Sequence, residues 1–308
     1  MLDWHGFAAT EFSRDQPMKI AAYLDAGRIR AGIVSSDLQS LLPLEMDEQA
    51  HAFGALRVIE RIAAQGAVPS TGAPVALGAV QLIAPLPRPR RNLFCVGKNY
   101  HAHAREFAGS GFDSSAKSGG DIPAAPIIFT KVPECVIAQG DAIVVPAEVS
   151  TAIDYEAELA VVIGRGGRRI PRAQAMEHVW GYTIVNDVTA RDWQSRHQQW
   201  DMGKSFDTFC PMGPWIVSAD ECDGTDTGVR CRVNGELRQD ASTRDFIFDI
   251  PTLIETLSAG ITLYPGDVIA TGTPVGVGIG FNPPKYLKPG DTVRVEIDGI
   301  GVLENPVR

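Results

Sequence analysis

The chain has 308 residues, enough for one large domain or two smaller ones. Hydrophobic residues make up 44% of it and charged residues 21%, which is typical of a globular protein with a buried core. The formal net charge of -9 argues against nucleic acid or an anionic membrane as a partner, because both bind basic surfaces.

The 5 cysteines are odd in number and contain no C-x-x-C pair, so neither a disulfide framework nor a zinc ribbon is expected. No run approaches the roughly 18 apolar residues that a membrane span needs, and the first residues hold no apolar signal-peptide core. We therefore expect a cytoplasmic enzyme.

Residues 1–90 are expected to form a small N-terminal α/β domain together with its linker. Two strand-like runs within residues 18–34 flank a turn of sequence Asp-Ala-Gly and predict a hairpin. Residues 50–65 carry apolar side chains at near-helical spacing and predict a helix. The proline-rich segment 85–91 is the predicted boundary, so that residues 91–308 form the second, catalytic domain.

The second domain is predicted to be rich in short strands. Glycine-containing turns precede strand-like runs at three places, 139–141, 265–267 and 289–291. Helices are expected to be few and short, with one opening at Pro171 and the others at 189–197 and 251–258. Many strands with few helices favour an α+β, β-rich fold, a mixed β-sandwich roll, over a doubly wound sheet.

Two acidic side chains stand inside an otherwise apolar, strand-like run, 154–164. Because successive strand residues point to opposite faces, Glu156 and Glu158 share one face, about 6.5 Å apart along the chain. A hard cation such as Mg2+ or Mn2+ relieves both their repulsion and their loss of hydration. Asp187 follows the next apolar run and is the candidate third ligand. For an E-x-E pattern taken alone, a solvated sheet face is the commoner alternative.

A candidate base lies further toward the N-terminus. His103 and Glu106 are three positions apart, which on a helical turn places both side chains on one face. A carboxylate on one imidazole nitrogen makes the other nitrogen a better base, and such a pair could activate a water molecule. An ordinary contact on a surface helix is the alternative for this segment alone.

Four further residues are candidate substrate contacts. Lys204 could bind an anion, Gln194 could donate a hydrogen bond, and Lys131 is a weaker candidate cation. The glycine-rich segment 270–278 lacks the G-x-G-x-x-G pattern of a dinucleotide loop, so we interpret it as a tight loop whose Thr273 hydroxyl can face a ligand. A lone lysine is more often a solvated surface residue.

Residues 107–121 are rich in glycine and serine and directly follow the candidate base. They predict either a mobile lid that closes over the substrate or a solvated loop without a role, and the sequence favours neither. Limited proteolysis with and without a substrate analogue would distinguish the two.

Six motifs follow one another along residues 92–308: G-K-N-Y-x-x-H-x-x-E, F-T-K, D-Y-E-A-E-L-A-V-V-I-G, N-D-V-T-A-R-D-x-Q, G-K-S-F-D and G-D-V-I-A-T-G-T-P-x-G-V-G. This succession closely resembles the fumarylacetoacetate hydrolase superfamily and is more specific than any single motif. Residues 1–90 look like the variable small domain of longer bacterial members.

The resemblance implies that the acidic set, Glu156, Glu158 and Asp187, holds Mg2+ or Mn2+, and that the His103–Glu106 pair activates water. Ca2+ is an ion that the same oxygen ligands could take up in a crystal. The resemblance also implies a homodimer and a small-molecule keto acid as substrate. Substrate contacts are expected at four positions, Lys131, Gln194, Lys204 and Thr273.

Metabolic members of the superfamily hydrolyse or decarboxylate 1,3-dicarbonyl acids, and related members isomerise or hydrate products of aromatic catabolism. Our first hypothesis is a divalent-metal-dependent hydrolase that cleaves a carbon–carbon bond in an acylpyruvate-type β-diketo acid. Water attacks the distal carbonyl, and the leaving group is the enolate of pyruvate, stabilised by the metal. The alternatives are a lyase or isomerase that decarboxylates or tautomerises a keto diacid, and a non-catalytic metal-bound module.

Overall fold

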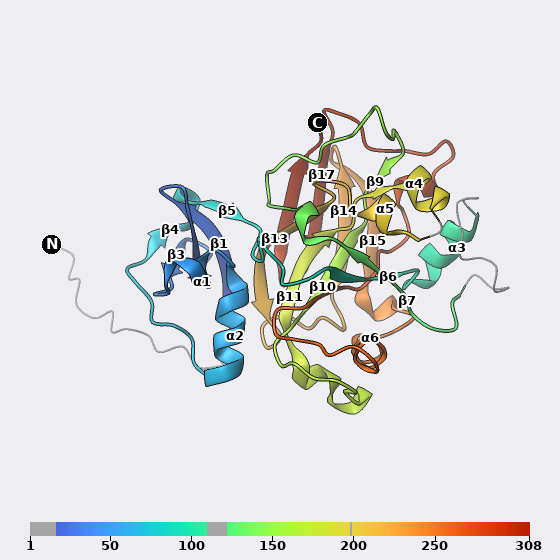
Figure 1. Ribbon diagram of the computed structural model, residues 1–308. Coiled ribbons are helices and arrows are strands. Elements are labelled where there is room, and N and C mark those ends of the chain that lie inside the picture. The colour runs from blue at the N-terminus through green and yellow to red at the C-terminus, as the bar shows by residue number, and fades with distance from the viewer. Residues whose placement is uncertain (1–16, 110–121, 198) are drawn as a thin grey trace.

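The computed structural model describes residues 17–109, 122–197 and 199–308. Figure 1 shows a smaller part, formed by the N-terminal strands with helix α2, and a larger part that holds the remaining strands. The fold is β-rich with several sheets, as the sequence predicts. Of the predicted lid, residues 110–121 lie outside the described part of the chain.

The smaller part opens with the predicted hairpin. Its two strands are antiparallel, and Asp25 pairs with Arg28 across the turn. The elements of this part are β1 (Lys19–Asp25), β2 (Arg28–Val34), β3 (Ser40–Pro43), α1 (Glu48–His51), α2 (Ala55–Gln65), β4 (Val75–Ala76) and β5 (Gln81–Ile83).

The single helix predicted over residues 50–65 is wrong at its start, because the chain forms two helices there. Between α1 and α2, Gly54 has a φ of 55°, which breaks the regular helical path. The chain also approaches Pro85 closely at this point, since a Cβ atom on Gly54 would lie 2.5 Å from the Pro85 oxygen. Apolar spacing continues through the break, and so the periodicity alone does not show it.

The larger part alternates short strands with short helices. Its elements are β6 (Leu93–Gly97), α3 (His101–Gly109), β7 (Ile127–Lys131), β8 (Val136–Ile137), β9 (Ile153–Asp154), β10 (Ala157–Ile163), β11 (Val179–Asn186), β12 (Thr189–Ala190), α4 (Arg191–Arg196), α5 (Asp201–Lys204), β13 (Cys210–Ser218), β14 (Gly228–Val233), β15 (Glu236–Ser242), α6 (Ile250–Ser258), β16 (Val268–Ala270), β17 (Thr292–Ile297) and β18 (Gly301–Pro306).

Two of the helices predicted here need correction. The segment 189–197 begins as strand β12, which pairs with β9, and turns helical only at Arg191. The helix expected to open at Pro171 is a 3-10 helix, Arg172–His178. The third prediction is confirmed as α6, where Asp249 caps the first turn by accepting a hydrogen bond from the Thr252 amide.

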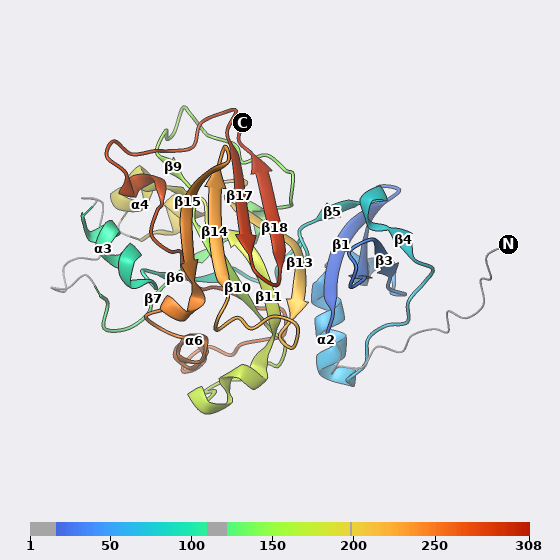
Figure 2. The same cartoon turned by 180° about the vertical axis from the view of Figure 1, so that it is seen from behind.

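The core lies on both faces of one large sheet. This sheet has 12 strands, ten of them in the order β4-β3-β2-β1-β13-β11-β10-β16-β6-β7. Alternate residues of β10 face opposite sides of the large sheet. Leu159 and Val161 pack into the core that this sheet shares with the four-stranded sheet β15-β14-β17-β18. The four-stranded sheet lies in front in Figure 2. Ala160 and Val162 pack toward the other core. Both faces of β10 are therefore buried, which explains its continuous apolar run.

The large sheet crosses the predicted domain boundary near residue 90. Strand β1 of the smaller part pairs with β13 of the larger part through Lys19 and Ile20. The division into residues 1–90 and 91–308 stays a prediction, and the two parts share main-chain hydrogen bonds.

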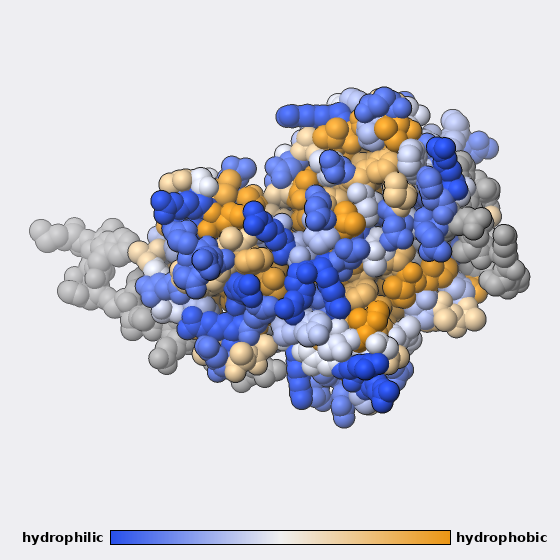
Figure 3. Space-filling model, viewed as in Figure 1, coloured by the Kyte–Doolittle hydropathy of each residue, from blue (hydrophilic) through white to orange (hydrophobic). Residues whose placement is uncertain are grey.

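The described surface is mixed. Figure 3 shows mostly hydrophilic residues on the face seen in Figure 1, interrupted by separate apolar patches. No helix among the described residues is long and apolar enough to cross a membrane.

Two glycines at the ends of α2 offer a matched test of backbone strain. Gly54 and Gly66 both have positive φ, but a Cβ atom would clash only at Gly54. We expect Gly66→Ala to lower the free energy of unfolding by about 1–2 kcal/mol, the penalty of a left-handed residue. Gly54→Ala should lower it by about 3 kcal/mol or more, because the clash adds to that penalty. Urea unfolding measures both, and equal losses would contradict the close approach to Pro85.

Candidate active site

Three carboxylates meet at the start of strand β10. Glu156 directly precedes the strand, Glu158 lies within it, and Asp187 follows the neighbouring strand β11. One oxygen of each carboxylate lies within 4.8 Å of the other two, and all three residues are buried. The structure thus brings the predicted acidic set together, and its members do not lie on a solvated sheet face.

Buried basic side chains surround this acidic set. The Lys204 Nζ atom lies 2.8 Å from Glu156 Oε2 and 2.7 Å from Asp187 Oδ2. The Lys131 Nζ atom lies 2.7 Å from Asp187 Oδ1. The Arg191 Nη2 atom lies 2.7 Å from Glu156 Oε1. For a lone lysine in a sequence, a solvated surface position is the commoner alternative. Both Lys131 and Lys204 are buried instead.

Arg191 also belongs to the site, although the sequence alone did not indicate it as a candidate. Its Nε donates to Asp154 Oδ2 over 2.8 Å, and its Nη1 donates to Gln194 Oε1 over 3.1 Å. Asp154 in turn accepts the backbone N–H groups of Gly278 and Ile279. Arg191 and Asp154 both stand inside motifs quoted above, but their pairing joins segments far apart in sequence.

The two glutamates differ in their electrostatic surroundings. Burial would raise the pKa of Glu156, but Lys204 and Arg191 outweigh this effect and lower it to about 2. Burial, Asp187 and Glu156 together raise the pKa of Glu158 well above its usual value. Among the described residues, no basic side chain forms an ion pair with Glu158, and the Gly272 N–H donates to it over 2.9 Å. The negative charge is therefore least balanced at Glu158.

The candidate base stands beside the acidic set. His103 Nδ1 lies 3.1 Å from Glu106 Oε2, within helix α3, and His103 is 4% exposed. Glu106 also accepts the Gly276 N–H over 3.0 Å. A carboxylate on Nδ1 favours the tautomer that leaves a lone pair on Nε2. The spacing of the two residues predicted this contact, and burial of His103 argues against an ordinary surface pair.

Thr273 also lies at the site, but its hydroxyl forms hydrogen bonds within the protein. Its Oγ1 donates to the Ala157 oxygen over 3.0 Å and accepts from Gln239 Nε2 over 2.8 Å. Gln239 also accepts the Ala157 N–H. Thr273 thus ties its loop to the first residue of β10 while lining the site.

A narrow cavity of about 10 Å³ lies among these side chains. Its walls include six of the candidate residues, His103, Glu156, Glu158, Gln194, Lys204 and Thr273. The space is no larger than one water molecule needs, so a larger ligand would require side chains to move.

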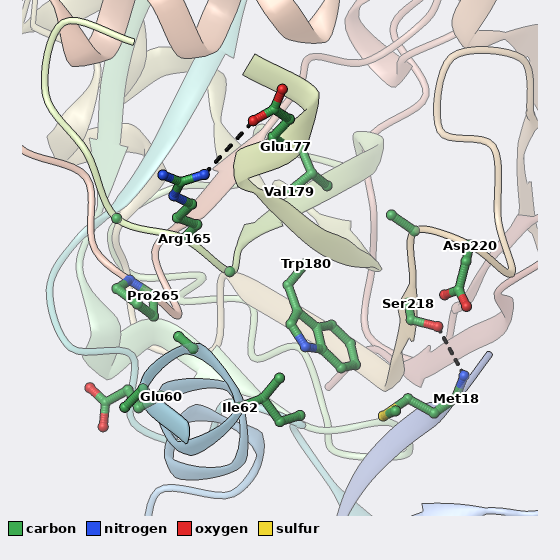
Figure 4. Close-up of a pocket in the computed structure, with 15 residues that line it drawn as sticks. Met18, Glu60, Ile62, Arg165, Glu177, Val179, Trp180, Ser218, Asp220 and Pro265 are labelled. Carbon is green, nitrogen blue, oxygen red and sulfur yellow. Dashed lines mark hydrogen bonds and ion pairs between the residues drawn. The ribbon is translucent and has the colours of Figure 1, made fainter. Parts of the chain in front are cut away.

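A larger hollow lies elsewhere, between α2 and the larger part. Figure 4 shows its walls, with Trp180 facing Ile62 and Met18, and Arg165 paired with Glu177. Its volume is about 740 Å³, yet none of the acidic or basic site residues line it. The chemistry of the side chains, and not the size of the hollow, therefore marks the candidate site.

Comparison with known proteins shows which family the chain belongs to. The family described as fumarylacetoacetate (FAA) hydrolase, C-terminal, matches residues 92–308. The chain belongs to this family. The chain is 52% identical over 232 residues to oxaloacetate tautomerase YisK of Bacillus subtilis, covering 75% of this chain and 74% of the relative. The human mitochondrial oxaloacetate tautomerase FAHD2A is 44% identical over 231 residues, covering 74% and 69%.

Solved structures of the fumarylacetoacetate hydrolase superfamily share the fold of this member. Fumarylacetoacetate hydrolase from Exiguobacterium antarcticum superposes with a TM-score of 0.79 at 39% identity, over 94% of this chain and 99% of the other. Maleylpyruvate hydrolase from Sphingobium sp. SYK-6, in complex with manganese(II) and pyruvate, gives a TM-score of 0.71 at 31% identity, over 94% and 98%. The matches at 94% extend beyond the family region into the N-terminal part.

A divalent cation fits the acidic set of this protein. Three carboxylates in mutual reach provide the hard oxygen ligands that Mg2+ and Mn2+ prefer. Burial and the neighbouring carboxylates of Asp187 and Glu156 raise the pKa of Glu158, and a cation would offset both effects.

The two glutamates should respond differently to the same substitution. Glu156→Gln removes the partner of Lys204 and Arg191, so we expect the metal-free protein to lose about 3 kcal/mol of stability. Glu158→Gln removes the poorly balanced charge, so the stability of the metal-free protein should stay equal or rise at neutral pH.

Both variants should lose Mg2+ and Mn2+ binding in calorimetric titrations. Thermal unfolding of the chelator-treated proteins compares their stability. Equal destabilisation of both variants would contradict the unequal charge balance, and unchanged metal affinity in both would exclude the acidic set as the metal site.

Proposed function

We propose that the protein is a divalent-metal-dependent tautomerase that interconverts the keto and enol forms of oxaloacetate or a similar keto diacid. The observation that carries this proposal is the cavity that Glu156 and Glu158 of the acidic set share with His103. The relatives named oxaloacetate tautomerases, at 52% and 44% identity, support the choice of reaction.

Glu156, Glu158 and Asp187 would hold Mg2+ or Mn2+. When bound there, the ion supplies Lewis-acid chemistry, which favours negative charge on a keto oxygen. Lys131, Lys204 and Arg191 form ion pairs with two of the three carboxylates, Glu156 and Asp187.

The proposal assigns the proton transfer to His103. In the keto-to-enol direction, His103 Nε2 accepts a proton from the carbon next to the keto group, and the electron pair of that C–H bond forms the carbon–carbon double bond. The proton then goes to the former keto oxygen, which completes the enol. Glu106 holds the ring through Nδ1 and stabilises its positive charge while the proton is on it.

Acylpyruvate hydrolysis is the second candidate function. The intact His103–Glu106 pair favours it, because the same base could deprotonate a water molecule that attacks the distal carbonyl. The solved maleylpyruvate hydrolase at 31% identity also supports it. The homodimer and the cytoplasmic location expected from the sequence remain predictions.

The experiment follows the ultraviolet absorbance of enol-oxaloacetate after its addition to metal-stripped protein with and without Mg2+ or Mn2+. We expect metal-dependent loss of the enol that exceeds the rate with Glu156→Gln protein at the same metal concentration. This control matters because free metal ions and buffer also tautomerise oxaloacetate. His103→Ala should lower the enzymatic rate by about 10²- to 10⁴-fold, the usual contribution of a general base.

The same protein is tested with acetylpyruvate and assayed for pyruvate. Cleavage of acetylpyruvate, without acceleration of the tautomerisation, would replace the tautomerase by the hydrolase. Release of pyruvate from oxaloacetate at the rate of enol loss would identify a decarboxylase.

A further inference from the structure

Two peptide units join the glutamates of the acidic set. Ala157 lies between Glu156 and Glu158, so its N–H belongs to one of these units and its C=O to the other. A peptide unit is planar, and only the dihedral angles on either side of it can change. The orientation of the two units therefore sets the distance between the two carboxylates and the directions in which they point.

Side chains hold both backbone groups of Ala157. On this side, pairing of β10 with β16 begins only at Ala160. The Ala157 N–H donates to Gln239 Oε1 over 3.0 Å, and the Ala157 oxygen accepts the Thr273 hydroxyl over 3.0 Å. Gln239 Nε2 donates to Thr273 Oγ1 and to the Pro274 oxygen, each over 2.8 Å. One glutamine side chain thus joins the strand of the candidate metal ligands to the loop beside it.

Gln239 is itself held in place. It lies on β15, within the four-stranded sheet, and it is 0% exposed. The loop that carries Thr273 approaches the same strand closely, since a Cβ atom on Gly276 would lie 1.9 Å from the Arg238 oxygen. Because strand and loop are already in close contact, the reach of the Gln239 side chain determines where the Ala157 backbone lies.

We propose that Gln239 is a positioning residue that holds Glu156 and Glu158 at the spacing a small cation such as Mg2+ needs. Among the described residues that line the cavity Gln239 is absent, so it acts through Ala157 and Thr273. Mg2+ requires near-ideal octahedral geometry at about 2.0–2.1 Å, whereas Ca2+ accepts variable geometry at about 2.3–2.6 Å. This assignment rests on the metal site of the proposed function and does not depend on its reaction.

The test compares Mg2+ and Ca2+ binding to the chelator-treated full chain by calorimetry. Gln239→Met keeps the size of the side chain and removes its three hydrogen bonds. We expect Mg2+ binding to weaken by about 10- to 100-fold, the usual loss when a residue that orients a metal ligand is replaced. Ca2+ binding should weaken less, so the ratio of the Mg2+ affinity to the Ca2+ affinity falls.

A second variant keeps the proposal testable where Gln239→Met does not fold. Gln239→Asn retains the amide, and its shorter side chain cannot span the same gap. We expect the ratio of the two affinities to fall in this variant as well. Thermal unfolding of the metal-free proteins identifies the folded variants and gives the temperature range in which the titrations are made.

Asn305→Leu is the matched control. Asn305 lies on β18 of the same four-stranded sheet and is 1% exposed, and its Nδ2 donates to the Ala138 and Asp141 oxygens over 2.7 and 2.9 Å. This variant also removes a buried amide that joins the sheet to a loop, but the loop holds none of the candidate metal ligands. We expect it to lower the unfolding temperature and to leave both metal affinities unchanged.

The outcomes separate this assignment from the proposed function. An unchanged Mg2+ affinity in the Gln239 variants, equal losses for Mg2+ and Ca2+, or the same losses in Asn305→Leu would overturn the assignment and leave the metal site standing. A wild type that binds neither ion would overturn both. The expected change of ratio in a protein without tautomerase activity would support the role of Gln239 and refute the proposed reaction alone.

Discussion

The balance of charge around Glu156, Glu158 and Asp187 is the constraint on which the site depends. Together with Asp154, these make four buried carboxylates that face three buried cations, Lys131, Lys204 and Arg191. Burial of any one of these groups alone would be very unfavourable. Among the described residues, Glu158 is the one of these four acids without an ion pair, and a divalent cation placed there would balance its charge.

The large sheet makes such a charged cluster possible. Strand β10 is covered on both faces, and its neighbours β11 and β16 deliver Asp187 and the Gly272 N–H to the glutamates at its start. Parallel pairing of β16 with β6 brings the ends of these two strands to one edge, so that Asn99 reaches the Thr271 oxygen. Apolar packing along the strands thus supports a polar site at one end of the strands, where several segments meet.

The sequence predicted the parts of the site that depend on local spacing. Glu156 and Glu158 share a side because strand geometry requires it, and His103 meets Glu106 because helical geometry requires it. The roles of Lys131 and Arg191 depend on partners 56 and 37 positions away, which no local pattern reveals. The β-rich fold followed from turn and strand patterns, whereas the break at Gly54 depends on a contact with Pro85 from beyond the helix.

Under the proposed function, Lys204 would link metal binding to substrate binding. In the structure its ammonium group bridges Glu156 and Asp187, the same carboxylates that are predicted metal ligands. A carboxylate oxygen shared between an ammonium group and a divalent ion binds each of them less well, because both are positive. Occupation of the acidic set by a metal would therefore weaken the hold on Lys204 and allow its ammonium group to turn to a substrate anion. Under the proposed function, the contact seen here and the predicted role in substrate binding would be two states of one side chain, with the metal bound before the keto acid.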